Sequence, residues 1–141
     1  MDPRGGMDRT QRRSAQLITG RGTLVFADLD PVVGHEQRGL RPCVIVSDPE
    51  VAEDQRFALV CVVPVTGTPG EGLLYPRLAP GPSGLAKPSW ALIDQLRSID
   101  KRRIRRILGQ ITRIENETID AGLAAFLGLR PYVGLRIVKQ F

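Results

Sequence analysis

The 141-residue sequence is long enough for one domain with its own hydrophobic core and too short for two. Its 42% hydrophobic and 25% charged residues are typical of a soluble globular protein, and no apolar run approaches the length of a membrane span. The arginine-rich start is not followed by the apolar run of a secretory signal. We therefore expect a cytoplasmic protein with no membrane partner.

The formal net charge of +5 is concentrated in a few segments. Residues 1–21 and residues 128–141 each carry a net charge of +3, which leaves residues 22–127 slightly acidic. A basic cluster nevertheless lies inside this body: Arg97, Lys101, Arg102, Arg103, Arg105 and Arg106. Such a cluster either follows the phosphates of a nucleic acid or forms a solvated turn, and the sequence leaves both interpretations open.

The sequence predicts no metal site and no cofactor. It contains one histidine and two cysteines, and these do not form a zinc-ligand spacing. Cys43 and Cys61 both lie in apolar runs, which favours buried, unpaired thiols in a reducing compartment.

The middle of the chain consists of short apolar runs separated by turn residues. These runs predict strands at residues 23–29, 42–47, 57–65, 73–78, 90–96 and 107–111. Pro76 indicates an edge strand, Gly109 indicates a bulge, and residues 48–55 are expected to form a polar connection. The Gly- and Arg-rich residues 1–20 are expected to be a disordered arm.

The hydrophobic period changes near the C-terminus. Four apolar residues share one helical face: Ile119, Leu123, Phe126 and Leu127. Asn116 is the expected N-cap, and Gly128 is the expected C-terminal stop. Gly122 costs about 1 kcal/mol relative to alanine, so this helix should need packing against the strands. Six short strands and one terminal helix predict a mainly β protein, a partly closed antiparallel barrel.

The most informative polar segment is residues 34–42, a glycine-punctuated loop that runs directly into a buried strand. Arg41 stands at the junction, where Pro42 restricts it to an extended conformation. Thr66 stands at the far end of the next buried run. If the two strands pair antiparallel, the start of one lies beside the end of the other. We therefore expect Arg41 and Thr66 to meet at one rim of the sheet.

Four motifs stand in the order and at the spacing of one known family: Arg21-Gly22 with Phe26-Ala27-Asp28-Leu29, then Pro31 to Pro42, Pro64-Val65-Thr66, and Asp94 to Arg103. Over residues 21–129 the chain resembles the MazF/PemK toxin family, with residues 130–141 as a C-terminal extension. The resemblance implies an SH3-like barrel of the type shared with CcdB toxins. It also implies a homodimer and a cognate MazE-like antitoxin whose tail blocks the active groove.

The resemblance further implies a sequence-specific, ribosome-independent endoribonuclease, or mRNA interferase, that cleaves single-stranded RNA with Arg41 and Thr66 as catalytic residues. Attack by the adjacent 2′-hydroxyl develops extra negative charge on the phosphorus. An arginine fork can stabilise this charge without a metal ion, and a threonine hydroxyl can add a hydrogen bond worth about 2–4 kcal/mol in the transition state.

Seven further residues are expected to bind RNA: His35, Glu36, Gln37, Arg38, Asp94, Gln95 and Arg97. Glu36 is either the general base or a loop carboxylate that orients a neighbouring arginine. His35 could act as an acid or base near neutral pH, although the resemblance assigns it no essential role. Asp94 and Gln95 either read base edges or hold the following turn. Trp90 either packs with its indole partly wet or offers a stacking platform for a base.

Two other functions remain open. A CcdB-type toxin acts on DNA gyrase by protein contact and needs neither an arginine nor a threonine at these strand ends, so their presence argues against it. A non-catalytic SH3-like module that binds RNA through the basic turn is compatible with the same fold.

Overall fold

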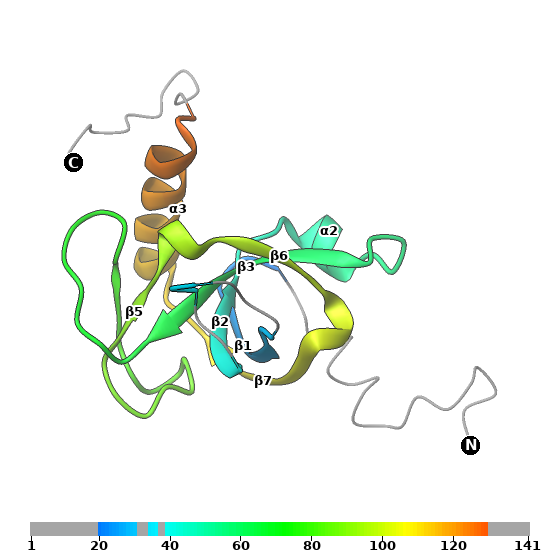
Figure 1. The fold of residues 1–141 in the computed structure, drawn as a ribbon, viewed down its shortest axis with the longest axis horizontal. Helices are drawn as coiled ribbons and strands as arrows, with labels where there is room; N and C mark the ends of the chain where they lie inside the picture. The colour runs from blue at the N-terminus through cyan, green and yellow to red at the C-terminus, as the bar shows by residue number, and fades with distance from the viewer. Residues whose placement is uncertain (1–19, 31–33, 37–38, 130–141) are drawn as a thin grey trace.

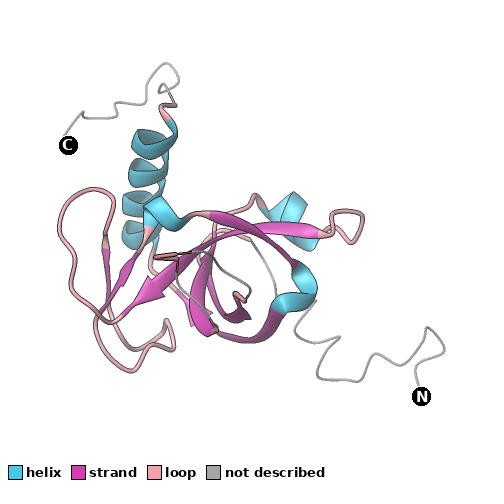
Figure 2. Cartoon of the chain, in the orientation of Figure 1, coloured by secondary structure: helices cyan, strands magenta, loops and turns pink. Residues whose placement is uncertain are grey.

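The computed structural model describes residues 20–30, 34–36 and 39–129. Its elements are β1 (Thr23–Asp28), β2 (Leu40–Ile45), α2 (Pro49–Glu53), β3 (Leu59–Thr66), β4 (Arg77–Leu78), β5 (Ser89–Ala91), the 3-10 helix η1 (Ile93–Gln95), β6 (Arg97–Asp100), the 3-10 helix η2 (Lys101–Arg103), β7 (Ile104–Gln110) and α3 (Arg113–Leu127). Figure 2 shows that strands dominate and that α3 is the one long helix among the described residues.

The strands form one seven-stranded sheet in the order β4-β5-β3-β2-β1-β7, with β6 also paired to β3. Every pairing is antiparallel. Figure 1 shows β1, β2, β3, β6 and β7 curled into a ring, with α3 outside the ring at the upper left and α2 beside β3 and β6. This architecture confirms the expected mainly β barrel with a C-terminal helix.

The two faces of the sheet bury different cores. Side chains alternate between faces along a strand, and on β3 Val62 belongs to one core while Val63 belongs to the other. The first core, which contains Val63, also includes Ile119 and Leu123 of α3. The second core lies inside the curl of the sheet and includes Val25, Cys43, Ile45, Val60, Val62 and Ile99. Burial on both faces explains why β2 and β3 are almost continuously apolar.

The C-terminal helix begins earlier than the sequence pattern indicated. Thr112, not Asn116, is the N-cap: its hydroxyl accepts from the backbone N–H of Glu115, whose carboxylate accepts from the N–H of Thr112. This capping box extends the helix by a turn before its first apolar contact. Gly128 ends the helix in the left-handed conformation at φ 68°, as expected.

The two predicted strands between residues 73 and 96 were too long. Only Arg77–Leu78 and Ser89–Ala91 form strands, and Ile93–Gln95 turns into a 3-10 helix. The turn lets β3 change partners, from β5 near Thr66 to β6 near Val62. The sequence prediction missed strand β6 and the short helix α2, because both lie in polar segments that carry no clear hydrophobic period.

The bulge expected at Gly109 is present in β7. The pairing with β1 skips one residue between Gly109 and Ile107. A Cβ at Gly109 would lie 2.2 Å from the carbonyl oxygen of Pro82, so the loop before β5 packs directly on the bare backbone there. Close approach of a second backbone is a recognised reason for glycine in a strand.

Most of the predicted arm at residues 1–20 and all of the extension at residues 130–141 lie outside the described residues. Gly20 is described and is buried against Pro49. Within the described part of the chain, no helix combines the length and apolarity needed to cross a membrane.

Candidate functional site

Arg41 and Thr66 lie at the same rim of the sheet. Strands β2 and β3 pair with Cys43 opposite Pro64 and Val44 opposite Val63. The hydrogen-bonded pairing of β2 with β3 ends there, next to two prolines that cannot donate backbone hydrogen bonds. The same register, continued by two residues, would place Arg41 across from Thr66.

Both side chains point to the inner face of the curl, at the point where its core ends. Along each strand they continue the alternation of inner-core residues, Cys43 on β2 and Val62 on β3. Arg41 is exposed and Thr66 is half-buried, so solvent and a ligand can reach this end of the barrel. The rim therefore combines a rigid strand scaffold with accessible polar groups.

The Thr66 hydroxyl is held by a local turn. Its Oγ1 accepts a hydrogen bond from the backbone N–H of Thr68 at 3.2 Å. A hydroxyl that accepts one hydrogen bond still has its proton to donate. The turn thus orients the oxygen and leaves a donor for a ligand atom.

Arg97 crosses the same end of the barrel. It lies opposite Val62 at the start of β6, and its Nη1 donates to the carbonyl of Leu29 at 3.0 Å. Its positive charge also acts on the Cys43 thiol, although burial is the larger effect and raises the pKa of Cys43 to about 12. Cys43 is therefore a neutral, inert thiol at physiological pH.

The loop that carries His35 and Glu36 is fixed at its base. Asp30 accepts from the N–H of Gly39 at 3.0 Å, and the N–H of Leu29 donates to the carbonyl of Gly39 at 2.9 Å. His35 and Glu36 are both exposed between these anchors. The predicted RNA contacts Gln37 and Arg38 lie outside the described residues.

Asp94 and Gln95 belong to the 3-10 helix η1 between β5 and β6. Asp94 is exposed and accepts a 2.6 Å hydrogen bond from the hydroxyl of Tyr75. This hydrogen bond raises the pKa of Tyr75, so the phenol remains a donor to the carboxylate. Gln95 is half-buried. The structure thus gives Asp94 a positioning partner that sequence inspection did not identify.

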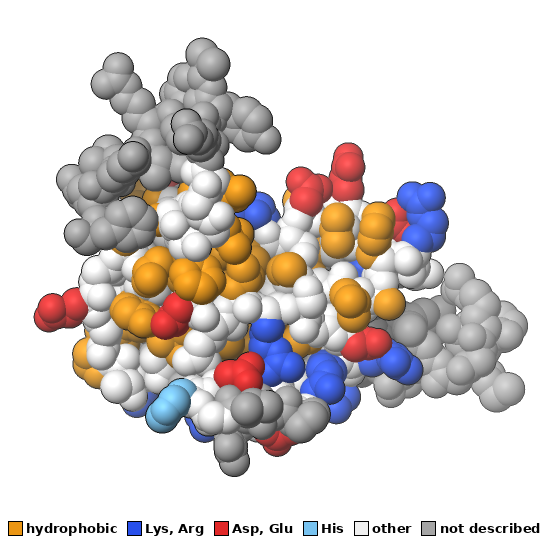
Figure 3. Space-filling view, turned by 45° about the horizontal axis from the view of Figure 1, so that its top comes forward, with side chains coloured by type: hydrophobic (Ala, Val, Ile, Leu, Met, Phe, Trp, Pro, Cys, Tyr) orange, Lys and Arg blue, Asp and Glu red, His pale blue; other side chains and the backbone are white. Residues whose placement is uncertain are grey.

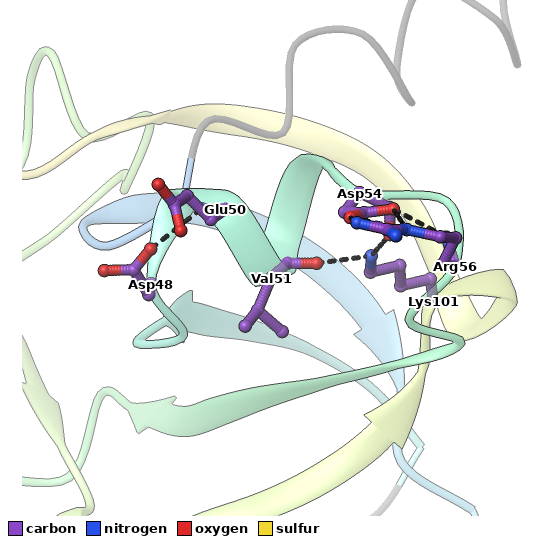
Figure 4. Close-up of polar contacts among 6 residues, drawn as sticks. All are labelled: Asp48, Glu50, Val51, Asp54, Arg56 and Lys101. Atoms are coloured by element: carbon purple, nitrogen blue, oxygen red, sulfur yellow. Dashed lines mark hydrogen bonds and ion pairs between the residues drawn. The ribbon is translucent and has the colours of Figure 1, made fainter.

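The basic cluster is largely engaged with the protein's own backbone. Lys101 donates to the carbonyls of Val51 and Asp54 at 2.7 and 2.9 Å, which ties η2 to α2 (Figure 4). Arg103 donates to the carbonyls of Asp28 and Asp30. The exposed Arg102 pairs with Asp100 and holds the pKa of that carboxyl at about 2. The sequence suggested either a phosphate-binding patch or a solvated turn, and neither interpretation included this role in holding loops and helices together.

The other two members of the cluster also have neighbours. Arg105 lies 3.7 Å from Asp28, and the Arg106 guanidinium stands 5.0 Å from the centre of the Phe26 ring. Figure 3 shows several Lys and Arg side chains on the lower part of this face, with acidic side chains among them. The ion pairs of Arg102 with Asp100 and of Arg105 with Asp28 make the cluster less strongly cationic than the sequence count suggests.

Sequence inspection missed Lys87, whose side chain lies beside Gly67, the residue after Thr66. A methyl group at Gly67, the residue after Thr66, would lie 2.5 Å from Lys87 Cε and 2.7 Å from Lys87 Nζ. The ammonium of Lys87 therefore sits over the turn that holds the Thr66 hydroxyl. A lone lysine in a Pro- and Ser-containing loop carries no recognisable pattern, so only the tertiary structure reveals it.

No group of three or more His, Cys, Asp or Glu side chains within residues 20–30, 34–36 and 39–129 is arranged to hold a metal ion. Cys43 and Cys61 are both free thiols.

Comparison with known proteins gives a consistent result. The family model described as PemK-like, MazF-like toxin of type II toxin-antitoxin system matches residues 20–127. Endoribonuclease EndoA from Bacillus subtilis (strain 168) is 30% identical over 104 residues, which cover 74% of this chain and 87% of that protein.

Solved structures agree with the sequence comparison. MazF from Deinococcus radiodurans is 28% identical with a TM-score of 0.67, covering 79% of this chain and 97% of that chain. An endoribonuclease from a mycobacterial species, solved in complex with its cognate antitoxin, is 26% identical with a TM-score of 0.64, covering 80% and 97%. A MazE–MazF complex from Deinococcus radiodurans is 26% identical with a TM-score of 0.63, covering 80% and 98%.

Proposed function

The chain belongs to the PemK-like, MazF-like toxin family of type II toxin-antitoxin systems, and we propose that it is an endoribonuclease that cuts single-stranded RNA at specific sequences, independently of the ribosome. The observation that supports the proposal is the antiparallel pairing of β2 with β3, which brings the start of β2, with Arg41, beside the end of β3, with Thr66. Similarity to Endoribonuclease EndoA supports the same reaction class.

The proposed reaction is an in-line attack by the 2′-hydroxyl on the neighbouring phosphorus. A bond forms between the 2′-oxygen and phosphorus, and the bond from phosphorus to the 5′-oxygen breaks. The products are a 2′,3′-cyclic phosphate and a 5′-hydroxyl. The 2′-hydroxyl proton passes to a base, and the departing 5′-oxygen takes up a proton.

In this scheme Arg41 and Thr66 stabilise the charge that develops on the phosphoryl oxygens. The planar arginine donates two charge-assisted hydrogen bonds, and the Thr66 hydroxyl donates a third from its fixed position. Arginine titrates far above neutral pH, so we assign the base to the 34–36 loop instead. Glu36 and His35 are the two groups there that can take a proton.

The decisive experiment measures cleavage of a long unstructured RNA in excess EDTA. Wild-type protein is expected to cut it and to leave 5′-hydroxyl ends. Arg41→Ala and Thr66→Ala should each lose about 10²–10³-fold in kcat, the usual loss of one transition-state donor. Arg41→Lys should also be severely impaired, because an ammonium cannot replace the fork.

Two controls separate this loss from misfolding. Thr66→Ser keeps the hydroxyl and should retain most activity, whereas Arg113→Ala removes an exposed arginine on α3 and should retain all of it. Circular dichroism should show all variants folded. Full activity of a folded Arg41→Ala variant would refute the assignment, as would normal cleavage of a substrate with 2′-deoxy at the scissile position.

We also propose a cognate MazE-like antitoxin as the protein partner, since a similar mycobacterial endoribonuclease was solved with its cognate antitoxin and a similar MazF from Deinococcus radiodurans with MazE. The proposed assembly is a homodimer in the cytoplasm. Large apolar side chains are exposed on the monomer: Leu40, Phe57, Leu59, Ile114, Phe126, Leu127 and Leu129. Sedimentation at micromolar concentration should give twice the monomer mass, and a monomer would contradict the homodimer.

A further inference from the structure

One row of residues crosses four neighbouring strands and leads away from Arg41 and Thr66. Thr66 on β3 lies opposite Trp90 on β5, and Trp90 lies opposite Arg77 on β4. The β2–β3 register, continued two residues past Cys43 and Pro64, would place Arg41 at the other end of the row. Opposite residues in paired strands share a face, so all four side chains stand on the same side of the sheet.

The burial of the flanking residues confirms which face this is. Ser89 and Ala91 flank Trp90 on β5 and are buried, and Ala91 belongs to the core beneath α3. Trp90 between them points the opposite way and is half-buried. In the described part of the chain, the half-buried apolar side chains that pack against the two cores do not include Trp90. Its indole is therefore partly open on the Thr66 side of the sheet.

The chemistry of this row suits an RNA strand. Neighbouring strands lie about 4.8 Å apart, so Arg41 and Arg77 are separated by three such steps, about 14 Å. The row offers a guanidinium, an indole and a hydroxyl next to the proposed cleavage point. An aromatic face stacks on any base, and an exposed arginine such as Arg77 binds the phosphate backbone.

We propose that Trp90 stacks on a base of the bound RNA next to the scissile phosphate and that Arg77 binds the backbone beyond that base. Both are substrate-positioning residues, distinct from the pair that stabilises the reacting phosphate. The inference rests on the proposed RNA-cleaving function. It adds the path of the RNA strand, from Arg41 and Thr66 across β5 to the sheet edge at β4.

Trp90 is the only tryptophan in the sequence, so its fluorescence reports on this position alone. The cut sequence is first determined by mapping the cleavage products of wild-type protein. An oligonucleotide with that sequence and a 2′-O-methyl group at the scissile position then binds without being cut. We expect it to quench the fluorescence of Trp90. A series with one abasic site at each position should lose the quenching at one or two positions next to the cut.

Variants give a second, independent readout. Trp90→Leu keeps an apolar side chain but removes the stacking face, and it should weaken binding by about 10- to 100-fold. Trp90→Phe should stay within a few-fold of wild type. The weaker binding of Trp90→Leu should appear as a higher KM, with a much smaller change in kcat. Arg77→Ala should lower the salt slope of binding by about 0.7, and Arg77→Lys should restore it.

Different results would overturn the proposed RNA-cleaving function and the proposed roles of Trp90 and Arg77. A folded wild-type protein that neither binds nor cuts RNA would overturn the proposed function. Normal cleavage by wild type, without quenching and with unchanged RNA affinity in Trp90→Leu, would overturn only the stacking role. Unchanged salt dependence in Arg77→Ala would overturn the backbone contact. Far-ultraviolet circular dichroism checks that each variant retains the strands.

Discussion

Replacing Gly122 by alanine tests how closely α3 packs on the sheet. Gly122 is buried in the middle of α3. A Cβ at this position would lie 2.7 Å from the carbonyl oxygen of Leu73 and 3.2 Å from Ile93 Cγ1. The first distance is a clash with backbone, which cannot rotate away as a side-chain tip can. Either α3 or the segment before Tyr75 has to shift.

Two opposing effects set the expected size of the change. Alanine favours the helix over glycine by about 1 kcal/mol. Forcing an extra methyl group into a packed site costs about 1–3 kcal/mol. The net result should be a loss of about 0–2 kcal/mol in the free energy of unfolding. Helix propensity alone predicts a gain in the free energy of unfolding. The sign of the measured change therefore shows whether propensity or the steric clash dominates.

Urea denaturation measures this difference, and position 118 on the same helix supplies the control. Thr118 is exposed, so Thr118→Ala should be more stable than Thr118→Gly by about 1 kcal/mol. The alanine-over-glycine difference at 122 should therefore fall below that at 118 by about 1–3 kcal/mol. Equal differences at the two positions would show that α3 does not contact the Leu73 carbonyl.

Two further outcomes are expected. Because burial raises the pKa of Cys43 to about 12, a thiol reagent at pH 8 should label Cys61 in the folded protein and Cys43 only after unfolding; equal labelling rates would contradict the burial. Lys101→Met should lower the free energy of unfolding by about 1–3 kcal/mol, since two backbone carbonyls lose their donor, whereas Arg102→Ala should cost less than about 1 kcal/mol; similar losses in both would refute the structural role of Lys101.

Local patterns predicted much of the fold because their physical causes act within a few residues. The apolar runs that became β2 and β3 were found. Of the four residues expected on one helical face, Ile119 and Leu123 are buried in the core, whereas Phe126 and Leu127 are exposed. The N-cap was misplaced because the apolar period begins only at Ile119, well after the N-cap Thr112. The Thr112–Glu115 capping box was present in the sequence and could have corrected it. Polar segments without periodicity concealed β6.

The proposed catalytic pair was predictable for a related reason. Pairing between two consecutive buried strands is the simplest antiparallel arrangement, and it brings the start of one beside the end of the next. That rule requires no knowledge of the rest of the barrel. Arg97, in contrast, was expected among the RNA contacts as a member of the basic cluster, and the structure shows it donating to the Leu29 carbonyl.

The sequence by itself determined the mainly β class, the terminal helix and the two strand ends that carry Arg41 and Thr66, because period, proline placement and strand order are local properties of the chain. The tertiary structure alone decided which cations serve the fold and which face the site. Lys101 reaches carbonyls 47 and 50 residues away, and the link from Thr66 to Trp90 depends on pairing between the non-consecutive strands β3 and β5. Such long-range contacts depend on the curvature of the whole sheet, which cannot be read from the sequence of any one segment.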